Sequence, residues 1–171
     1  MSRQLHRQRG LTLIEVLISI VIFAVGVLGL TKIMNRAALT EAEALQRAQA
    51  MALAHDMADR IMANRANAAA YLGTVSSTGT VSGAACNAAG TRAAVDLCQW
   101  SDTLRGAAMV EEGAARVGSM IGAQACIEQL PFGAGTYAVT VAWQGLMGTG
   151  APDNACGTGS FGSEDLRRTY T

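Results

Sequence analysis

Residues 11–30 read Leu-Thr-Leu-Ile-Glu-Val-Leu-Ile-Ser-Ile-Val-Ile-Phe-Ala-Val-Gly-Val-Leu-Gly-Leu, an apolar run that contains a single charged side chain, Glu15. A run of 20 residues is long enough for a helix that crosses a hydrocarbon core of about 30 Å. A charged group inside such a helix costs roughly 2.5–3.5 kcal/mol on insertion scales, unless it finds a partner. The stretch therefore predicts a membrane helix whose Glu15 needs a positively charged partner.

The ten residues before this run, Met-Ser-Arg-Gln-Leu-His-Arg-Gln-Arg-Gly, carry three arginines and no acid. An ordinary secretory signal peptide is one alternative, but its apolar region is typically 7–15 residues long, and this run is longer. A plain signal anchor with an accidental glutamate is a second alternative. The basic leader predicts that the N-terminus lies in the cytoplasm and that the bulk of the chain lies outside, by the positive-inside rule.

The junction of leader and apolar run resembles the class III signal of type IV prepilins and pseudopilins. The matching residues are Arg7, Arg9, Gly10, Thr12, Leu13, Ile14 and Glu15. The family usually has Phe where this chain has Leu11, which is also bulky and apolar. The resemblance implies that a prepilin peptidase cleaves between Gly10 and Leu11 and methylates the new amine of Leu11. That amine would lie about one helical turn from Glu15, so the two groups can neutralise each other within one molecule or between neighbours.

The helical pattern continues beyond the apolar run, because no glycine occurs between residues 31 and 72. An apolar stripe with helical spacing is formed by Ala50, Leu53, Ala54, Met57, Ala58 and Ile61. Two acid–base pairs at i, i+4, Glu43 with Arg47 and Asp56 with Arg60, have the favourable order. We expect one helix over residues 11–72, with a membrane half at 11–34 and an exported half at 35–72. A hinge near residues 31–36 is the alternative.

Residues 73–171 are expected to form an α+β head. The clearest strand is Tyr137 to Gln144, where the large apolar side chains of Tyr137, Val139, Val141 and Trp143 face one way and Ala138, Thr140, Ala142 and Gln144 face the other. A second strand is expected from Arg167 to Thr171. Together with the apolar stripe, these strands predict a small antiparallel sheet packed on the exported half of the long helix.

Two further segments of the head have weaker signals. Residues 73–83 are rich in Gly, Ser and Thr and are expected to form a loop. Residues 94–110 are ambiguous, and Ser101 or Asp102 is able to cap a short helix there.

Four cysteines, Cys86, Cys98, Cys126 and Cys156, lie beyond the membrane run. In an exported domain they favour disulfides, and four cysteines allow three connectivities, of which sequence order favours Cys86–Cys98 and Cys126–Cys156. A zinc site is the rival, but the chain has no Cys-x-x-Cys pair, and His55 is the only histidine after the leader. We therefore expect no metal and no cofactor, with His55 at a surface or an interface.

Charge and motifs favour a structural role over an enzymatic or nucleic-acid-binding one. The whole chain has 13 basic and 13 acidic residues, and without the leader 10 basic residues remain, a balance unlike that of a basic nucleic-acid-binding surface. Lys32 is the only lysine, so no phosphate-binding Gly-x-x-x-x-Gly-Lys loop exists, and a single histidine leaves little room for a catalytic triad. We expect no enzymatic activity.

Further segments resemble the minor pilins of the PilV type, the pilus modification proteins. The similar segments are Phe23–Leu30, Ala50–Arg65, Asp96–Trp100, Leu130–Pro131, Val139–Gly145 and Arg167–Arg168. The chain departs from that family at its end, where Thr171 leaves the last strand short.

The PilV resemblance implies a type IV pilin fold and a low-copy subunit of a type IV pilus that supports assembly or priming, adhesion or twitching motility. It implies a single-pass protein of the inner membrane with a periplasmic C-terminal domain, which then enters the extracellular pilus. Its partners would be other major and minor pilins, the prepilin peptidase and the assembly platform, and no small-molecule substrate. The alternative is a minor pseudopilin (I-type) of a type II secretion system.

Overall fold

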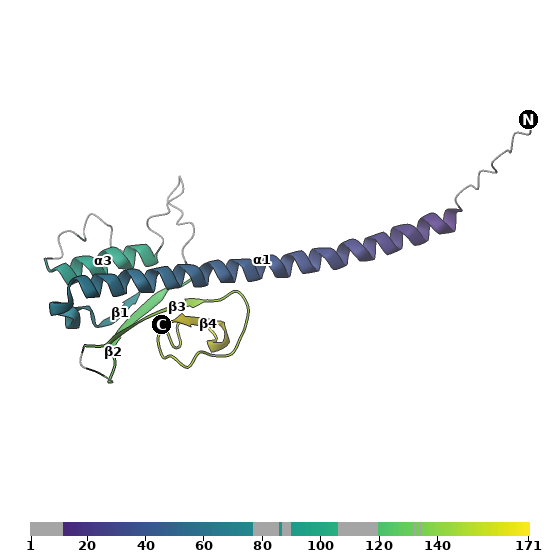
Figure 1. The fold of residues 1–171 in the computed structure, drawn as a ribbon. Helices are drawn as coiled ribbons and strands as arrows, with labels where there is room; N and C mark the ends of the chain where they lie inside the picture. Colours follow the sequence, from purple (N-terminus) through teal and green to yellow (C-terminus); the bar gives the residue numbers. More distant parts are fainter. Residues whose placement is uncertain (1–11, 77–85, 87–89, 106–119, 132, 134) are drawn as a thin grey trace, which may run out of the picture. The chain divides into compact units, whose positions relative to one another are not determined.

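The computed structural model describes residues 12–76, 86, 90–105, 120–131, 133 and 135–171. The chain divides into two compact units, Met1–Glu41 and Ala42–Thr171. Helix α1 (Leu13–Ala63) contributes to both of them, and every other element belongs to the second unit (Figure 1).

Helix α1 contains 51 residues and ends earlier than the sequence predicted. A 3₁₀ helix, η1 (Arg65–Tyr71), replaces the last part of the expected helix, so the helical segment predicted for residues 11–72 is wrong at its C-terminal end. Two asparagines explain the break, because Asn64 (φ −126°) and Asn67 (φ −119°) leave helical geometry. The side-chain amide of Asn67 donates to Oδ1 of Asn64 at 3.0 Å, a local bond of the kind that competes with helix continuation.

Four antiparallel strands form one sheet in the order β1-β2-β3-β4. Their bounds are β1 Gly73–Ser76, β2 Gln124–Gln129, β3 Tyr137–Gln144 and β4 Arg167–Tyr170. The predicted strand at Tyr137–Gln144 is confirmed, and β4 begins at the predicted Arg167. The expected loop at residues 73–83 is wrong at its start, because β1 pairs with β2 there, and its remaining residues 77–83 lie outside the described residues. Strand β2 has no counterpart among the sequence predictions.

Helix α3 (Arg92–Leu104) covers most of the segment 94–110, whose sequence was ambiguous, and residues 106–110 lie outside the described residues. Its N-cap is Thr91, whose side chain accepts a hydrogen bond from the Ala94 amide at 3.2 Å. The expectation that Ser101 or Asp102 caps a helix is therefore wrong, since both lie near the C-terminal end of α3. A satisfied N-cap hydroxyl typically contributes about 1 kcal/mol to helix stability.

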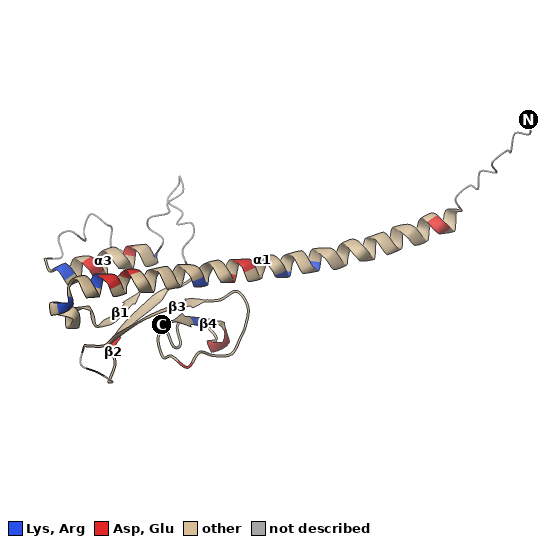
Figure 2. Cartoon of the chain, in the orientation of Figure 1, with Lys and Arg blue, Asp and Glu red and all other residues tan. Residues whose placement is uncertain are grey.

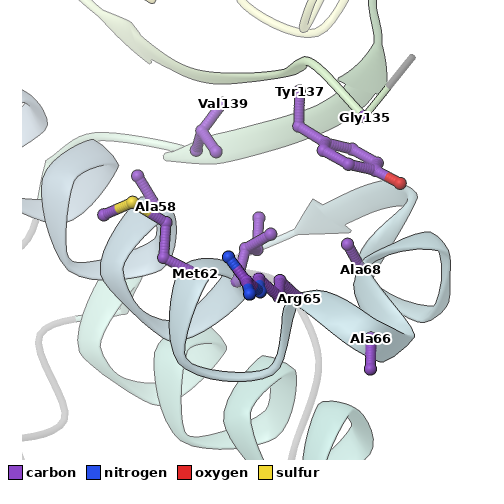
Figure 3. Close-up of a pocket in the computed structure, with 9 residues that line it drawn as sticks. Ala58, Met62, Arg65, Ala66, Ala68, Gly135, Tyr137 and Val139 are labelled. Atoms are coloured by element: carbon purple, nitrogen blue, oxygen red, sulfur yellow. The ribbon is translucent and has the colours of Figure 1, made fainter.

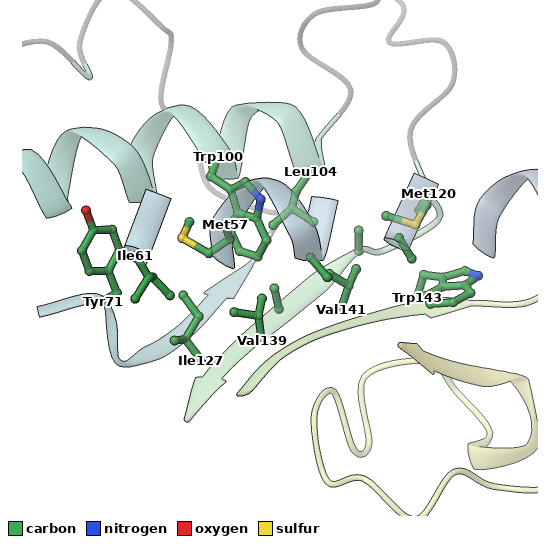
Figure 4. Packing of buried hydrophobic residues seen from close by; sticks show 14 of the residues in the cluster. Met57, Ile61, Tyr71, Trp100, Leu104, Met120, Ile127, Val139, Val141 and Trp143 are labelled. Carbon is green, nitrogen blue, oxygen red and sulfur yellow. The ribbon is translucent and has the colours of Figure 1, made fainter. Parts of the chain in front are cut away.

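The hydrophobic core of the second unit lies where α1, α3 and the sheet meet (Figure 4). Its largest fully buried side chains are Trp100, Tyr71, Met57, Leu104, Ile127 and Val141. The indole of Trp100 also donates to the Leu53 carbonyl at 3.0 Å, which ties α3 to α1. The α+β architecture expected from the sequence, a long N-terminal helix packed on a small antiparallel sheet, is confirmed.

The opposite face of the sheet is covered as well, by the segment between β3 and β4. Cys126, Ala142, Cys156 and Phe161 form a second buried cluster there. The disulfide Cys126–Cys156 crosses this cluster, and Cys86–Cys98 joins the chain before α3 to α3 itself. These are the two pairings that sequence order favoured.

Candidate assembly site

The first half of α1 exposes a largely apolar surface. Every residue from Thr12 to Leu30 is exposed, and the large apolar side chains include Leu13, Ile14, Leu17, Ile20, Ile22, Phe23, Val25 and Leu28. The helix is long and apolar enough here to cross a membrane. A surface of this kind is stable only in lipid or against other apolar helices.

Glu15 is the one charged side chain in this surface, and it lies in the first turn of α1 (Figure 2). The backbone amide of Glu15 donates to the Thr12 carbonyl at 3.1 Å, and the Glu15 carbonyl accepts from the Ser19 hydroxyl at 2.7 Å. Its carboxylate forms no ion pair or hydrogen bond within the part of the chain that the structure describes. An acid in the first turn is favoured by the helix dipole, but this effect is small beside the cost of the charge in lipid.

Gly10 and Leu11, the residues expected to flank the cleavage site, lie outside the described residues. The cleavage and the methylation of Leu11 therefore remain predictions.

Two glycines interrupt the apolar surface of α1. A Cβ atom added at Gly26 or at Gly29 would meet nothing within 4 Å, so both positions are open. Glycine weakens a helix by about 1 kcal/mol relative to alanine, yet in membranes it lets a neighbouring helix approach closely. The two glycines are thus places where a second helix can pack against α1.

In the second unit, a polar network fixes the end of α1 against α3. Asp96, whose side chain is 4% exposed, accepts from the Tyr71 hydroxyl at 2.6 Å and from Arg92 at 3.2 Å. Arg60 lies 3.6 Å from Asp96 and pairs with Asp56 at 3.0 Å, the i, i+4 pair that the sequence predicted. Burial, followed by the bond to Asp96, raises the pKa of Tyr71. With every group partnered, this network is structural.

Glu43 has a different partner from the one that its spacing suggested. Instead of Arg47, its Oε1 accepts from the amides of Leu146 and Met147 at 3.1 and 3.0 Å and lies 3.4 Å from Arg168. Two consecutive amides that point at one carboxylate form an anion-binding turn. Through these contacts Glu43 holds the loop after β3 and the start of β4 against α1.

The second unit also contains the four cysteines and His55, the side chains that were considered as metal ligands. Among the described residues, no group of three or more His, Cys, Asp or Glu side chains is placed to hold a metal ion. His55 lies on the exposed side of α1.

A mostly apolar groove of about 800 Å³ opens between the end of α1, η1 and β3 (Figure 3). It is lined by Ala58, Ile61, Met62, Arg65, Ala66, Ala68, Gly135, Tyr137 and Val139. From η1, the long side chain of Arg65 and the short side chains of Ala66 and Ala68 line it. Arg65 is exposed and forms no ion pair with any residue that the structure describes.

Two family models match successive parts of the chain. Residues 5–31 match the prokaryotic N-terminal methylation motif, and residues 34–103 match the type IV pilin Tt1218 family. No curated protein and no solved structure matches the chain.

The first match covers residues 5–10 before the apolar run, Glu15 and the exposed apolar half of α1, and it implies processing by a prepilin peptidase. The second covers the rest of α1 and nearly all of α3, in a family of structural, non-enzymatic proteins. The observed long helix on a four-stranded antiparallel sheet is the type IV pilin fold. The sequence reasoning had located Glu15 and the apolar run, but it missed the groove and the role of Glu43.

Proposed function

We propose that this chain, a type IV pilin-like subunit with an N-terminal methylation motif, is a minor subunit of a type IV pilus of the PilV type. The observation that carries the proposal is the exposed apolar half of α1 with its single carboxylate, Glu15, which has no partner among the described residues. Such a helix is suited to two environments in turn, the lipid of the membrane and the helical bundle of a filament. The disulfide-bonded second unit then forms the exported head.

Maturation follows from the same N-terminal segment. Residues 1–10 form the leader, a peptidase cuts between Gly10 and Leu11, and the Leu11 amine is methylated. The match of residues 5–31 to the methylation motif supports this step. Gly10→Val places a β-branched side chain at the scissile bond, so immunoblots should show the uncut precursor. A normally trimmed protein from that variant would contradict the assignment of the cleavage site.

The location of the protein follows from its charge distribution. The arginine-rich leader favours a cytoplasmic N-terminus, so residues 11–34 cross the inner membrane once and the head lies in the periplasm. From there the subunit enters the extracellular pilus at low copy. Its partners are the prepilin peptidase, the assembly platform and other major and minor pilins.

Glu15 acts when the subunit leaves the membrane. In lipid, the carboxylate lies near the cytoplasmic interface, where it stays hydrated, because it is only one turn inside the apolar run. In the filament that hydration is lost, and the methylated amine of a neighbouring subunit replaces it. Glu15 thus favours the register in which amine and carboxylate meet.

The test measures whether the subunit is present in pili and whether its deletion affects piliation or type II secretion. Mass spectrometry of sheared, washed pili should find peptides of the head, such as the one that ends at Arg105, in wild-type cells and none in a deletion strain. The deletion should lower piliation, adhesion or twitching while secretion through a type II system stays normal. Loss of secretion with unchanged pili would instead assign the chain to a pseudopilus as an I-type minor pseudopilin.

A further inference from the structure

The groove between α1, η1 and β3 exposes apolar side chains that no described residue covers. Met62, at its rim, is 65% exposed, and the neighbouring Arg65 is a cation without an ion pair among the described residues. The groove therefore combines an unfilled apolar space with one positive charge. An occupant that fits it carries an apolar side chain next to an acid.

The same chain presents that combination at the end of β2. Leu130 is 39% exposed, and Glu128, two residues earlier, is exposed and forms no ion pair in the described part of the chain. Both belong to the hairpin between β2 and β3, whose ends are held by the bond from the Leu130 amide to the Thr136 carbonyl at 2.9 Å. The end of β2 thus presents an exposed acidic side chain and an exposed apolar one, next to a backbone hydrogen bond that holds this position.

We propose that the groove of one copy receives the β2–β3 hairpin of a second copy, with Leu130 against Met62 and Glu128 beside Arg65. Gly135, a residue of the hairpin, itself lines the groove, so both features lie at the same end of the head. The contact joins two different surfaces, so it can continue from copy to copy.

The apolar and charged parts of this contact have separate roles. Burial of the leucine and methionine side chains supplies attraction, at about 25 cal/mol per Å² of apolar surface removed from water. An exposed ion pair contributes little by itself, so the pair of Glu128 with Arg65 selects the register and the partner. The contact needs only two copies in one membrane, and it therefore does not depend on the proposed pilus role.

Cysteine cross-linking in cells tests the proposal with the full chain. All four native cysteines are in disulfides, so an introduced cysteine is the one free thiol of each copy. Copies that carry Met62→Cys and Leu130→Cys, each with its own tag, are produced together and oxidised. A disulfide between them requires Cα atoms within about 7 Å, and we expect a mixed dimer on non-reducing gels.

Two pairings serve as controls for this cross-link. Ala151→Cys is also exposed, and it should give at least fivefold less mixed dimer with Met62→Cys. Leu45→Cys tests the rival occupant, the face of α1 on which Leu45 is 61% exposed. A stronger cross-link from Met62→Cys to Leu45→Cys than to Leu130→Cys, or no cross-link to Leu130→Cys, would overturn the proposal.

Charge reversal then tests the role of the two charged residues. Arg65→Glu on the copy with Met62→Cys should lower the yield of mixed dimer at least threefold, and so should Glu128→Arg on the copy with Leu130→Cys. With both reversals together, at least half of the original yield should return. Both residues are exposed, so the fold should be unaffected, which protection of the native disulfides from alkylation verifies. Equal yields in all four combinations would rule out the charge pairing.

Discussion

The hydroxyl of Tyr71 donates a 2.6 Å hydrogen bond to Oδ2 of Asp96, which joins the end of η1 to the first turns of α3. Both side chains are buried, so neither atom has water as an alternative partner. The side-chain amide of Asn64 donates to the same hydroxyl at 3.2 Å, at the point where α1 ends. One hydrogen-bond network therefore connects the residue at which α1 ends with α3.

Removal of this hydroxyl should weaken the head. Tyr71→Phe leaves one oxygen of buried Asp96 without its shortest hydrogen bond, which should cost about 1–3 kcal/mol of unfolding free energy. Urea denaturation of the full chain in detergent, followed by Trp fluorescence, measures the change. Tyr137→Phe is the matched control, and it should change stability by less than about 0.5 kcal/mol. Equal effects of the two variants would refute a special role for the Tyr71 hydroxyl.

At high pH, the free energy of unfolding should depend on the ionisation of Tyr71. The pKa of Tyr71 is raised above its ordinary value of 10.0, mainly by burial and then by the bond to Asp96. The unfolded chain therefore loses this proton at lower pH than the folded one. The stabilising contribution is complete below about pH 10 and disappears as the pH rises through the raised value. Tyr71→Phe should flatten the fall in stability above pH 10, and an unchanged slope would contradict the argument.

Glu43 should hold the loop after β3 in place. Glu43→Ala removes the acceptor of the Leu146 and Met147 amides, so hydrogen exchange of these two amides should speed up about tenfold or more, equivalent to about 1.4 kcal/mol. Arg47→Ala, one turn away on α1, is the control and should leave exchange unchanged. Fast exchange of both amides in the unaltered protein would show that the contact is not maintained in solution.

The two disulfides should be independent of each other. Cys126→Ser should leave Cys156 reactive toward alkylating agents while Cys86 and Cys98 stay protected, with a loss of about 2–4 kcal/mol in stability. Mass spectrometry after alkylation without reduction measures each thiol. Exposure of a thiol at Cys86 or Cys98, in a folded domain, would indicate a different connectivity.

Elements with strong local patterns could be predicted from the sequence. Helix α1 has a long apolar run followed by a helical stripe, and in β3 large apolar residues alternate with small or polar ones, so both follow from local periodicity. The end of α1 was missed because only Asn64 and Asn67 mark it, and asparagine is a weak helix breaker.

Elements that depend on distant partners could not be predicted in this way. Strand β1 has the composition of a loop and is a strand because Thr74 pairs with Cys126, far along the chain. Strand β2 lacks alternation because both of its faces are covered, Ile127 by the main core and Cys126 by the second cluster. The contact of Glu43 with the loop after β3, and the groove, likewise arise only when separate elements come together. Glu15 was found from sequence because its signal, a charge in an apolar run, is local.

The most direct measurement concerns Glu15→Leu, scored as the amount of this subunit in sheared filaments relative to its amount in the membrane. We expect normal membrane insertion and normal cleavage, because the apolar run becomes more apolar and the leader is unchanged. We expect at least a tenfold loss of the subunit from filaments, since the amine of a neighbouring subunit no longer has the Glu15 carboxylate as its partner; tenfold corresponds to about 1.4 kcal/mol. Ser19→Leu, one turn further along α1, is the control and should enter filaments normally. Wild-type incorporation of the Glu15→Leu protein would contradict the assembly role and reduce Glu15 to a local feature of the helix N-terminus.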